Sequence, residues 1–358
     1  MKTKLFTLFL AIAASIGTLL ADKVLIGDLY YNLNATSLTA EVTYKSLTAN
    51  TYSGDIVIPS SLTYSGKNYA VTSIGDHAFY NCSGLVSVTI PNSVVLIGDY
   101  AFFNSNDLKV ITIGNSVSNI GNRAFSSTAI TSIVIPASVT SIGDEAFVVC
   151  SNLSEITVAA TNSKYSSDDG VLYNKNKTTL MVCPMKKQGE YIIPNSVTTL
   201  NDYAFQGCSS LTSVTIPTKI TVISTSAFDG CSSLTSITIP KNVIRINQMA
   251  FRNCTSLQSV ICEVVTPISI ATSLEAQAPF FGVDRPNIPL YVPAESVDAY
   301  KAKDIWKEFN PILPIQNSPT EINNVSYDSP QNTKIIRDGQ LLILREGKTY
   351  TAQGAEVK

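Results

Sequence analysis

The residues of this chain that could do chemistry are seven cysteines, one histidine and a recurring set of carboxylates. A cysteine can act as a nucleophile beside a histidine base, and the two residue types together can hold a metal ion. Their spacing favours neither use, because the sequence contains no Cys-x-x-Cys pair and no cysteine–histidine cluster. We therefore expect no metal and no cofactor, and we expect that the protein is not an enzyme.

Five of the cysteines share one position, three residues after the phenylalanine of a recurring Ala-Phe pair. These are Cys82, Cys150, Cys208, Cys231 and Cys254. Two other copies have Ser105 and Thr128 there, and this exchange is typical of a small inward side chain that hydrogen-bonds a neighbouring coil. We expect buried free thiols. Distance excludes a disulfide between Cys82 and Cys150, roughly 14 Å apart at strand spacing, but leaves one open among the last three cysteines.

The single histidine, His77, occupies a repeat position that carries very different side chains in the other copies, as solvent-facing positions do. The position before it is a carboxylate in four copies and Asn, Thr or Gln in the others. That pattern favours turn capping by a short polar side chain over a calcium-binding ladder, which needs several oxygen ligands to converge. The carboxylates are Asp76, Asp99, Asp144 and Asp202.

The Ala-Phe pair belongs to a repeat of about 23 residues, which predicts a solenoid. One such coil cannot bury its apolar side alone, whereas stacked coils bury it against each other. Each copy ends in a β-branched run such as Val88-Thr89-Ile90-Pro91, which alternates like a half-buried strand. The predicted fold is therefore β-rich, of the α/β repeat class, with parallel strands. The repeated phenylalanines are Phe79, Phe102, Phe125, Phe147, Phe205, Phe228 and Phe251.

The repeat pattern resembles the BspA-like leucine-rich repeat family. The clearest copies are Ser73 to Val94 and Ser224 to Val243, and the resemblance extends from about Asp28 to Ile315. It implies an extracellular or cell-surface location and a role in protein binding or adhesion. It implies no particular ligand.

The regions outside the repeats predict a secreted protein with capped ends. Residues 1–21 have a positive start and an apolar stretch, which indicates a signal peptide, with a membrane anchor as the alternative. No transmembrane span is expected in the mature chain. Residues 22–71 predict a β-hairpin N-terminal cap, 72–262 the leucine-rich repeats, and 263–315 a strand-helix C-terminal cap with a helix at 295–309 and Trp306 in the core.

Three further segments interrupt or follow the repeats. An insertion at about 159–188 predicts a hairpin that either decorates the solenoid or contacts a ligand. Residues 316–332 predict a linker. Residues 333–358 predict a short β tail that is similar to the sorting tails of type nine secretion and could anchor the protein outside the cell.

The outward positions of the predicted strands are the candidate binding residues. They would form a flat, mainly uncharged ladder of hydroxyls, interrupted by Val110, Val134 and Glu155. Such a platform suits hydrogen bonding to an extracellular protein or matrix component, for example of a host, or to a glycan. The alternative is that Thr is simply a good solvated strand residue. A net charge of −2 and the lack of a basic–aromatic stripe argue against nucleic acid. The candidates are Ser87, Thr89, Val110, Thr112, Ser132, Val134, Glu155, Thr157, Ser213, Thr215, Ser236 and Thr238.

Overall fold

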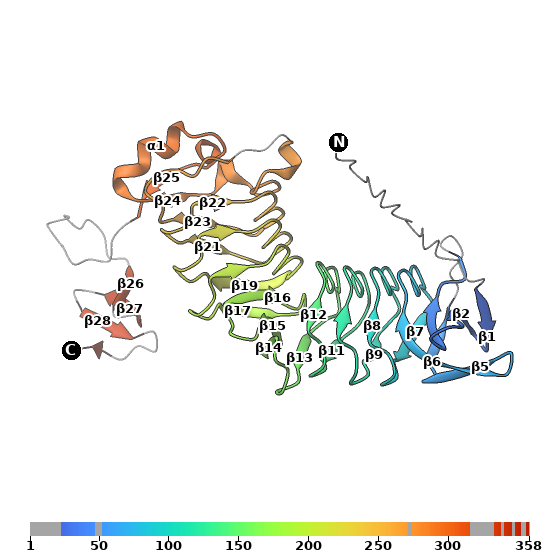
Figure 1. Cartoon of the computed structure of the whole chain (residues 1–358). Coiled ribbons are helices and arrows are strands. Elements are labelled where there is room, and N and C mark those ends of the chain that lie inside the picture. Colours follow the sequence, from blue (N-terminus) through green and yellow to red (C-terminus); the bar gives the residue numbers. More distant parts are fainter. Residues whose placement is uncertain are drawn as a thin grey trace, which may run out of the picture.

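The structure, a computed structural model, describes residues 23–46, 52–270 and 274–315, and the strands of the C-terminal tail. It is a parallel β-solenoid with little helix, which confirms the predicted fold class. The coils form two stacks that meet at a bend (Figure 1). The predicted signal peptide at 1–21 and linker at 316–332 lie outside the described residues. No helix of the described part is long and apolar enough to cross a membrane.

The longer strands of the coils form one side of the solenoid, which we call the sheet face. Their side chains alternate, so that Val88 is buried while Ser87 and Thr89 point outward. Most neighbouring strands of this face pair in parallel, with equivalent residues of successive coils opposite one another. In the first stack they are β4 (Gly54–Val57), β7 (Leu85–Thr89), β9 (Val110–Thr112), β11 (Ser132–Ile135) and β13 (Glu155–Val158). In the second they are β17 (Gln188–Ile192), β19 (Ser210–Thr215), β21 (Ser236–Ile239), β23 (Ser259–Cys262), β24 (Leu290–Val292) and β25 (Ile312–Pro314).

A second, narrower side consists of two-residue strands. The second residue of each strand, an isoleucine or leucine, points into the core, and Ile97 and Leu200 are almost fully buried. In the first stack the coils approach closely here, since a Cβ on Gly98 would lie 2.6 Å from the backbone nitrogen of Asp76. Glycine is therefore required by the stacking distance. These strands are β8 (Leu96–Ile97), β10 (Asn119–Ile120), β12 (Ser141–Ile142), β18 (Thr199–Leu200), β20 (Val222–Ile223) and β22 (Arg245–Ile246).

The third side carries the Ala-Phe turns, and we call it the loop face. Its backbone forms a ladder between coils, in which the N–H of Phe79 donates to the carbonyl of Ala101 at 2.6 Å and that of Phe102 to Ala124 at 2.7 Å. Residues on both sides of each phenylalanine have positive φ, for example His77 at 58° and Asn81 at 57°. This alternation turns every second N–H group toward the next coil, so the loops stack as regularly as the strands.

The repeated phenylalanines form the central column of the core. In the first stack the rings of Phe79, Phe102, Phe125 and Phe147 lie parallel, with neighbouring centroids 4.9 to 5.7 Å apart. The second column runs from Phe205 to Phe280 in the same way. Tyr52 covers the first ring, and Trp306 and Phe309 cover the last.

The N-terminal segment closes the open end of the first stack with antiparallel strands. β3 pairs with β6 in parallel and so joins the cap to the narrow side of the solenoid. A two-residue turn at Ser65 and Gly66, both with positive φ, connects β5 to β6. The cap strands are β1 (Val24–Ile26), β2 (Leu29–Asn34), β3 (Thr39–Thr43), β5 (Ser61–Tyr64) and β6 (Lys67–Ile74).

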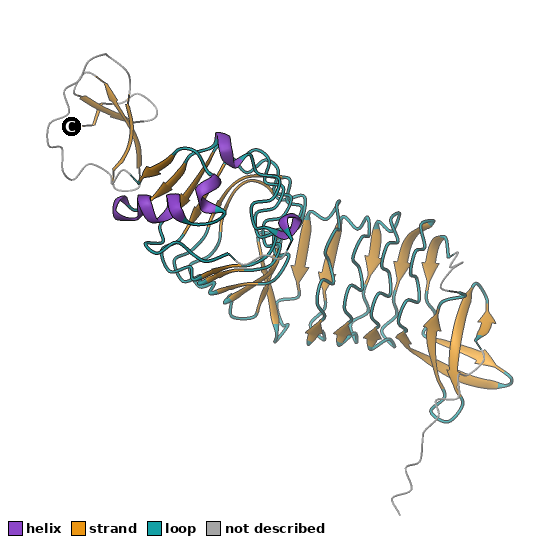
Figure 2. Ribbon diagram, turned by 90° about the horizontal axis from the view of Figure 1, so that it is seen from above, coloured by secondary structure: helices purple, strands orange, loops and turns teal. Residues whose placement is uncertain are grey.

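The C-terminal segment contains one more coil and then a broken helical region. Phe280 extends the phenylalanine column, although a proline rather than an alanine precedes it. The expected helix at 295–309 is instead a short α1 (Val297–Ala302) between the 3₁₀ turns η3 (Ala294–Ser296) and η4 (Trp306–Glu308). Figure 2 shows this region at the end of the second stack. Two further 3₁₀ turns are η1 (Glu275–Gln277) and η2 (Arg285–Asn287).

The helix is broken because two large side chains six residues apart must enter the same core. Tyr300 and Trp306 are both fully buried, with ring centroids 5.3 Å apart. In a continuous helix they would point to different sides. An extended Lys303 and a positive φ of 69° at Ile305 redirect the chain, and the indole N–H of Trp306 then donates to the carbonyl of Ile268 at 2.9 Å. Trp306 is thus a core residue, as predicted.

The insertion replaces one regular coil and produces the bend. The predicted hairpin across Asn174–Lys177 is formed by β15 (Val171–Asn174) and β16 (Thr179–Val182), and β14 (Tyr165–Asp168) precedes it. Asn162 fastens the insertion to the first stack, since its buried amide donates to the carbonyls of Pro136 and Val139 at 2.8 and 3.0 Å. The inserted segment has no Ala-Phe turn, so neither the ring column nor the loop ladder is continuous there.

The tail forms a separate four-stranded antiparallel sheet. Its strands are β26 (Thr333–Arg337), β27 (Gln340–Arg345), β28 (Lys348–Thr351) and β29 (Glu356–Val357).

Candidate functional site

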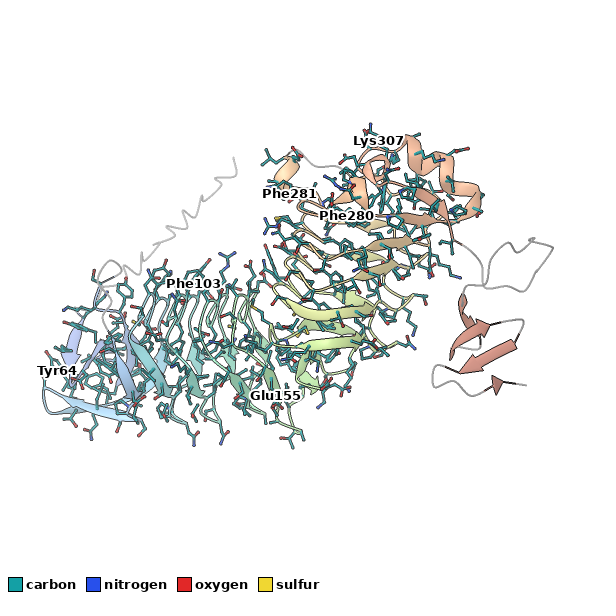
Figure 3. The ribbon with its side chains drawn as sticks, turned by 180° about the vertical axis from the view of Figure 1, so that it is seen from behind. Tyr64, Phe103, Glu155, Phe280, Phe281 and Lys307 are labelled. Carbon is teal, nitrogen blue, oxygen red and sulfur yellow. The ribbon has the colours of Figure 1, made fainter. Side chains whose placement is uncertain are left out.

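The twelve candidate residues all lie on the outer side of the sheet face, but in two groups. Those from Ser87 to Thr157 lie on the first stack, and those from Ser213 to Thr238 on the second. The insertion and the bend separate the groups (Figure 1). The predicted ladder is therefore two shorter platforms instead of one. Glu155, on the last strand of the first group, points away from the solenoid (Figure 3).

The first platform combines hydroxyls with exposed valines. Val110 is 55% exposed and Val134 59%, so water reaches most of each isopropyl group. Thr112 lies beside Val110 on β9, and Thr157 pairs with Val134 across strands. An apolar centre with a hydroxyl rim resembles the composition of protein-binding patches more than that of an ordinary solvated sheet.

The platforms extend beyond the predicted residues at their ends. Asp55 and Val57 of β4 lie in register with Ser87 and Thr89, and Val57 is 74% exposed. The Ser87 hydroxyl donates to the Asp55 carboxylate at 2.6 Å. Sequence reasoning missed these residues because no Ala-Phe pair precedes β4, although its run Ile56-Val57-Ile58-Pro59 matches the strand pattern of the repeats. On the second platform Ile192 is likewise an exposed apolar residue at the end of the ladder. It pairs with Thr215 and is 72% exposed.

The loop face carries a cluster of aromatic residues that the sequence reading also missed. His77 stacks on Tyr100 with centroids 5.1 Å apart and planes 7° from parallel, and Tyr80 stacks on Phe103 at 5.5 Å. All four side chains are half-buried, and Phe103 is marked in Figure 3. His77 is therefore part of an aromatic cluster rather than free in solvent. The available signal was the aromatic residues three apart in two successive coils.

Three of the four repeated carboxylates, Asp76, Asp99 and Asp202, cap a backbone N–H of the neighbouring coil, in agreement with the predicted capping role. The Asp76 carboxylate accepts the backbone N–H of Asp99 at 2.8 Å, and Asp99 accepts that of Asn122 at 2.7 Å. Asn122 does the same for Asp144, which explains why an amide can replace the carboxylate. The described residues contain no group of three His, Cys, Asp or Glu side chains that could hold a metal ion.

All seven cysteines are buried free thiols, as predicted. The thiol of Cys231 donates to the carbonyl of Phe205 in the preceding coil at 3.2 Å, and Ser105 makes the equivalent bond to Phe79 at 2.6 Å. Burial raises the pKa of Cys150 to about 11 and that of Cys254 to about 12. The thiolate, which is the nucleophilic form, is therefore scarce at neutral pH.

The stacked coils and open platforms define a leucine-rich-repeat-type solenoid. Proteins of this class have extended surfaces that are suited to binding. Six copies of the BspA type leucine-rich repeat region match residues 72–187 and 183–272. The chain therefore belongs to the BspA-type leucine-rich repeat family, which confirms the resemblance in its sequence. No curated protein sequence matches it.

Solved structures share the solenoid. A leucine-rich repeat protein from Eubacterium ventriosum is 24% identical, with 83% of each chain covered and a TM-score of 0.55. The pneumococcal vaccine antigen PcpA is 17% identical over 83% of this chain and 99% of its own, with a TM-score of 0.54. A leucine-rich cell surface protein from Faecalibacterium prausnitzii is 23% identical over 82% and 95%, with a TM-score of 0.40. The first two show that the fold is the same.

Proposed function

We propose that this protein is exported and binds an extracellular protein or matrix component through the sheet face of its first stack, as an adhesion protein does. The observation that carries the proposal is the set of exposed valines interspersed among the hydroxyls of this face. Val57, Val110 and Val134 are each more than half exposed on strands that are otherwise well packed. Burying a valine side chain stabilises an interface by about 1.5 kcal/mol or more. Covering these valines with a partner would therefore stabilise the complex.

The rigidity of the platform favours recognition without a large ordering cost. Each outward residue lies on a strand paired on one or both sides, and its inward neighbours belong to a continuous buried cluster. A preformed surface loses little conformational entropy when a partner binds. Export agrees with the apolar leader at 1–21, and the tail at 333–358 is proposed as the sorting signal that retains the protein outside the cell.

The experiment is retention of the full chain on immobilised fibronectin, fibrinogen, laminin and collagen, with a glycan array in parallel. We expect saturable retention on at least one matrix protein and weaker retention by Val134→Lys, which places a charge at the centre of the platform. Retention by glycans alone, or equal retention of the Val134→Lys variant, would overturn the proposal.

Glycan binding is the second candidate, and the aromatic cluster favours it. The half-exposed rings of Tyr80, Tyr100 and Phe103 offer flat apolar surfaces next to a phenol hydroxyl. Such amphipathic rings can contact an apolar face and hydrogen-bond a polar group at once. If glycans retain the chain and Tyr100→Ala abolishes retention, a glycan-capture role replaces the adhesion role.

A further inference from the structure

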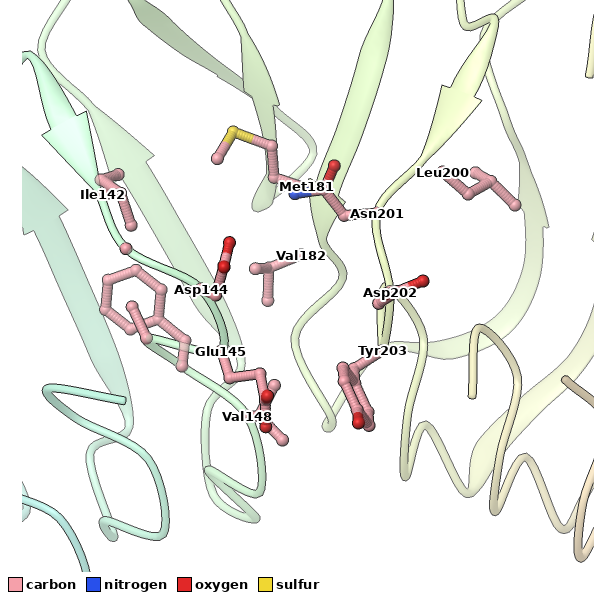
Figure 4. Close-up of a pocket in the computed structure, with 13 residues that line it drawn as sticks. Ile142, Asp144, Glu145, Val148, Met181, Val182, Leu200, Asn201, Asp202 and Tyr203 are labelled. Atoms are coloured by element: carbon pink, nitrogen blue, oxygen red, sulfur yellow. The ribbon is translucent and has the colours of Figure 1, made fainter. Parts of the chain in front are cut away.

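The bend opens a cleft on the loop face, between the coil of Phe147 and the coil of Phe205. Its volume is about 370 Å³. Asp144 and Glu145 lie on one wall and Asp202 and Tyr203 on the other, with Met181 and Val182 between them (Figure 4). The volume is near the lower end of the roughly 300–1,000 Å³ typical of ligand sites, so it suits a few residues rather than a folded domain.

The first wall is an open edge of the backbone ladder. In the preceding coil the N–H groups of Arg123 and Phe125 donate to the carbonyls of Asp144 and Ala146, both at 2.9 Å. The equivalent N–H groups of Glu145 and Phe147 have no acceptor among the described residues, because the insertion lacks the loop that would supply one. Two backbone donors therefore face the cleft without a protein partner.

The opposite wall is the matching acceptor edge. In a regular coil the carbonyl of Asp99 accepts the N–H of His77 at 2.9 Å. The equivalent carbonyl of Asp202 accepts no hydrogen bond from any described residue. The next carbonyl along, that of Ala204, is already taken by the N–H of Cys183 at 2.7 Å. The insertion thus occupies the inner part of the cleft, beside Ala204, and leaves the outer part, beside the Asp202 carbonyl, open.

One carboxylate at the mouth of the cleft is unpaired. Asp144 occupies the capping position, but no N–H of a following coil reaches its carboxylate, and no described cation pairs with it. Glu145 differs, since Arg123 neutralises it at 2.8 Å. The Asp202 carboxylate accepts the N–H of Thr225 at 2.9 Å and is turned toward that coil, away from the cleft (Figure 4). The Asp144 carboxylate therefore remains available to a cation.

We propose that the cleft binds a short extended segment of another protein that carries a lysine or arginine side chain. The segment continues the ladder: its carbonyls accept from Glu145 and Phe147, and its N–H groups donate to the Asp202 carbonyl and the Asp144 carboxylate. Its basic group lies beside the Asp144 carboxylate. Addition of a strand-like segment to an open backbone edge is an established mode of peptide recognition. The cleft lies on a different side from the sheet face, so this inference does not depend on the proposed function.

The experiment measures binding of labelled, end-blocked hexapeptides to the full chain by fluorescence polarisation. The peptides consist of Gly and Ser with Lys, Arg, Glu or Ser at the third position, and one Lys peptide is N-methylated on alternate amides. We expect the Lys and Arg peptides to bind at least tenfold more tightly than the Glu and Ser peptides. N-methylation should weaken the Lys peptide at least tenfold, because it removes the donors to Asp144 and Asp202.

One variant and a matched control locate the site. Asp144→Asn should weaken the Lys peptide about three- to tenfold, in the range of a charge-assisted hydrogen bond. Asn122 shows that the position accepts an amide and still caps its neighbour, so the Asp144→Asn variant should fold. Asp99→Asn, at the same position in an intact coil, should bind as the native chain does. No preference for Lys over Glu, insensitivity to N-methylation, or equal effects of Asp99→Asn and Asp144→Asn would overturn the inference.

Discussion

Phe125 stacks on Phe147 with ring centroids 5.7 Å apart and planes 2° from parallel, and the first ring column ends at Phe147. Phe125 also contacts Phe102 on its other side, at 5.2 Å. The two phenylalanines occupy equivalent repeat positions, and both are almost fully buried. They differ in having two ring neighbours or one, because the insertion supplies no further phenylalanine.

This difference predicts that truncation to alanine lowers the free energy of unfolding by different amounts at Phe125 and Phe147. Phe125→Ala should lower the free energy of unfolding by about 3–5 kcal/mol, the range for a fully packed phenylalanine. Phe147→Ala should lie at the lower end, since the site faces only one ring and can collapse toward the bend. Guanidinium denaturation of the two variants checks this. A larger loss for Phe147→Ala would mean that the bend is packed as tightly as the stack.

The thiols should be unreactive in the folded protein. All seven are buried and free, and burial holds the pKa of Cys82, Cys150 and Cys254 well above neutrality. Titration with a thiol-specific disulfide reagent at pH 7 should give close to zero reactive groups without denaturant and seven with it. Rapid reaction of the native protein, or fewer than seven groups after unfolding without reductant, would contradict the assignment.

Stability should fall at alkaline pH. Burial raises the pKa of Cys82 and Cys254 from 9.0 to about 12, so the folded state holds these protons more tightly than the unfolded state. The resulting stability is complete below pH 9 and is lost as the pH rises toward 12, by at most about 1.4 kcal/mol per pH unit for each thiol.

Melting temperatures measured from pH 6 to pH 11 test the predicted loss of stability at alkaline pH. They should change little up to pH 8 and fall above pH 9. The Cys254→Ser variant should fold, because Ser105 occupies the equivalent position, and its decline should be shallower than that of the native chain. Unchanged melting up to pH 11 would show that the thiols ionise without cost.

The periodic parts of the molecule could be predicted from the sequence, for a physical reason. The Ala-Phe spacing fixes which side chains face inward in every coil, so the parallel strands, the phenylalanine core and the outward hydroxyls all follow from one period. The Cys, Ser and Thr exchange identified the buried thiols in the same way. Asp76 and Asp99 could be recognised as caps because Asn122 shares their position.

The parts that break the period could not be derived from it. The gap between Phe147 and Phe205 revealed an insertion without an Ala-Phe turn, but not that this insertion splits the outward ladder and opens the cleft beside Asp144. The C-terminal helix looked continuous because Tyr300 and Trp306 are both apolar, but their common burial requires a turn at Ile305. Phe280 escaped detection because Pro279 replaces the alanine.

The central claim is that a partner meets the sheet face of the first stack. Its most direct test compares three single lysine substitutions at exposed apolar residues, one on each side of the solenoid, for binding to whichever matrix protein retains the full chain. Val134→Lys lies on the sheet face, Leu96→Lys on the narrow side and Val149→Lys on the loop face. We predict at least a tenfold loss of affinity for Val134→Lys and native affinity for the other two. If Val134→Lys bound with native affinity while Leu96→Lys or Val149→Lys lost affinity, the partner would bind another side of the solenoid and the claim would be wrong.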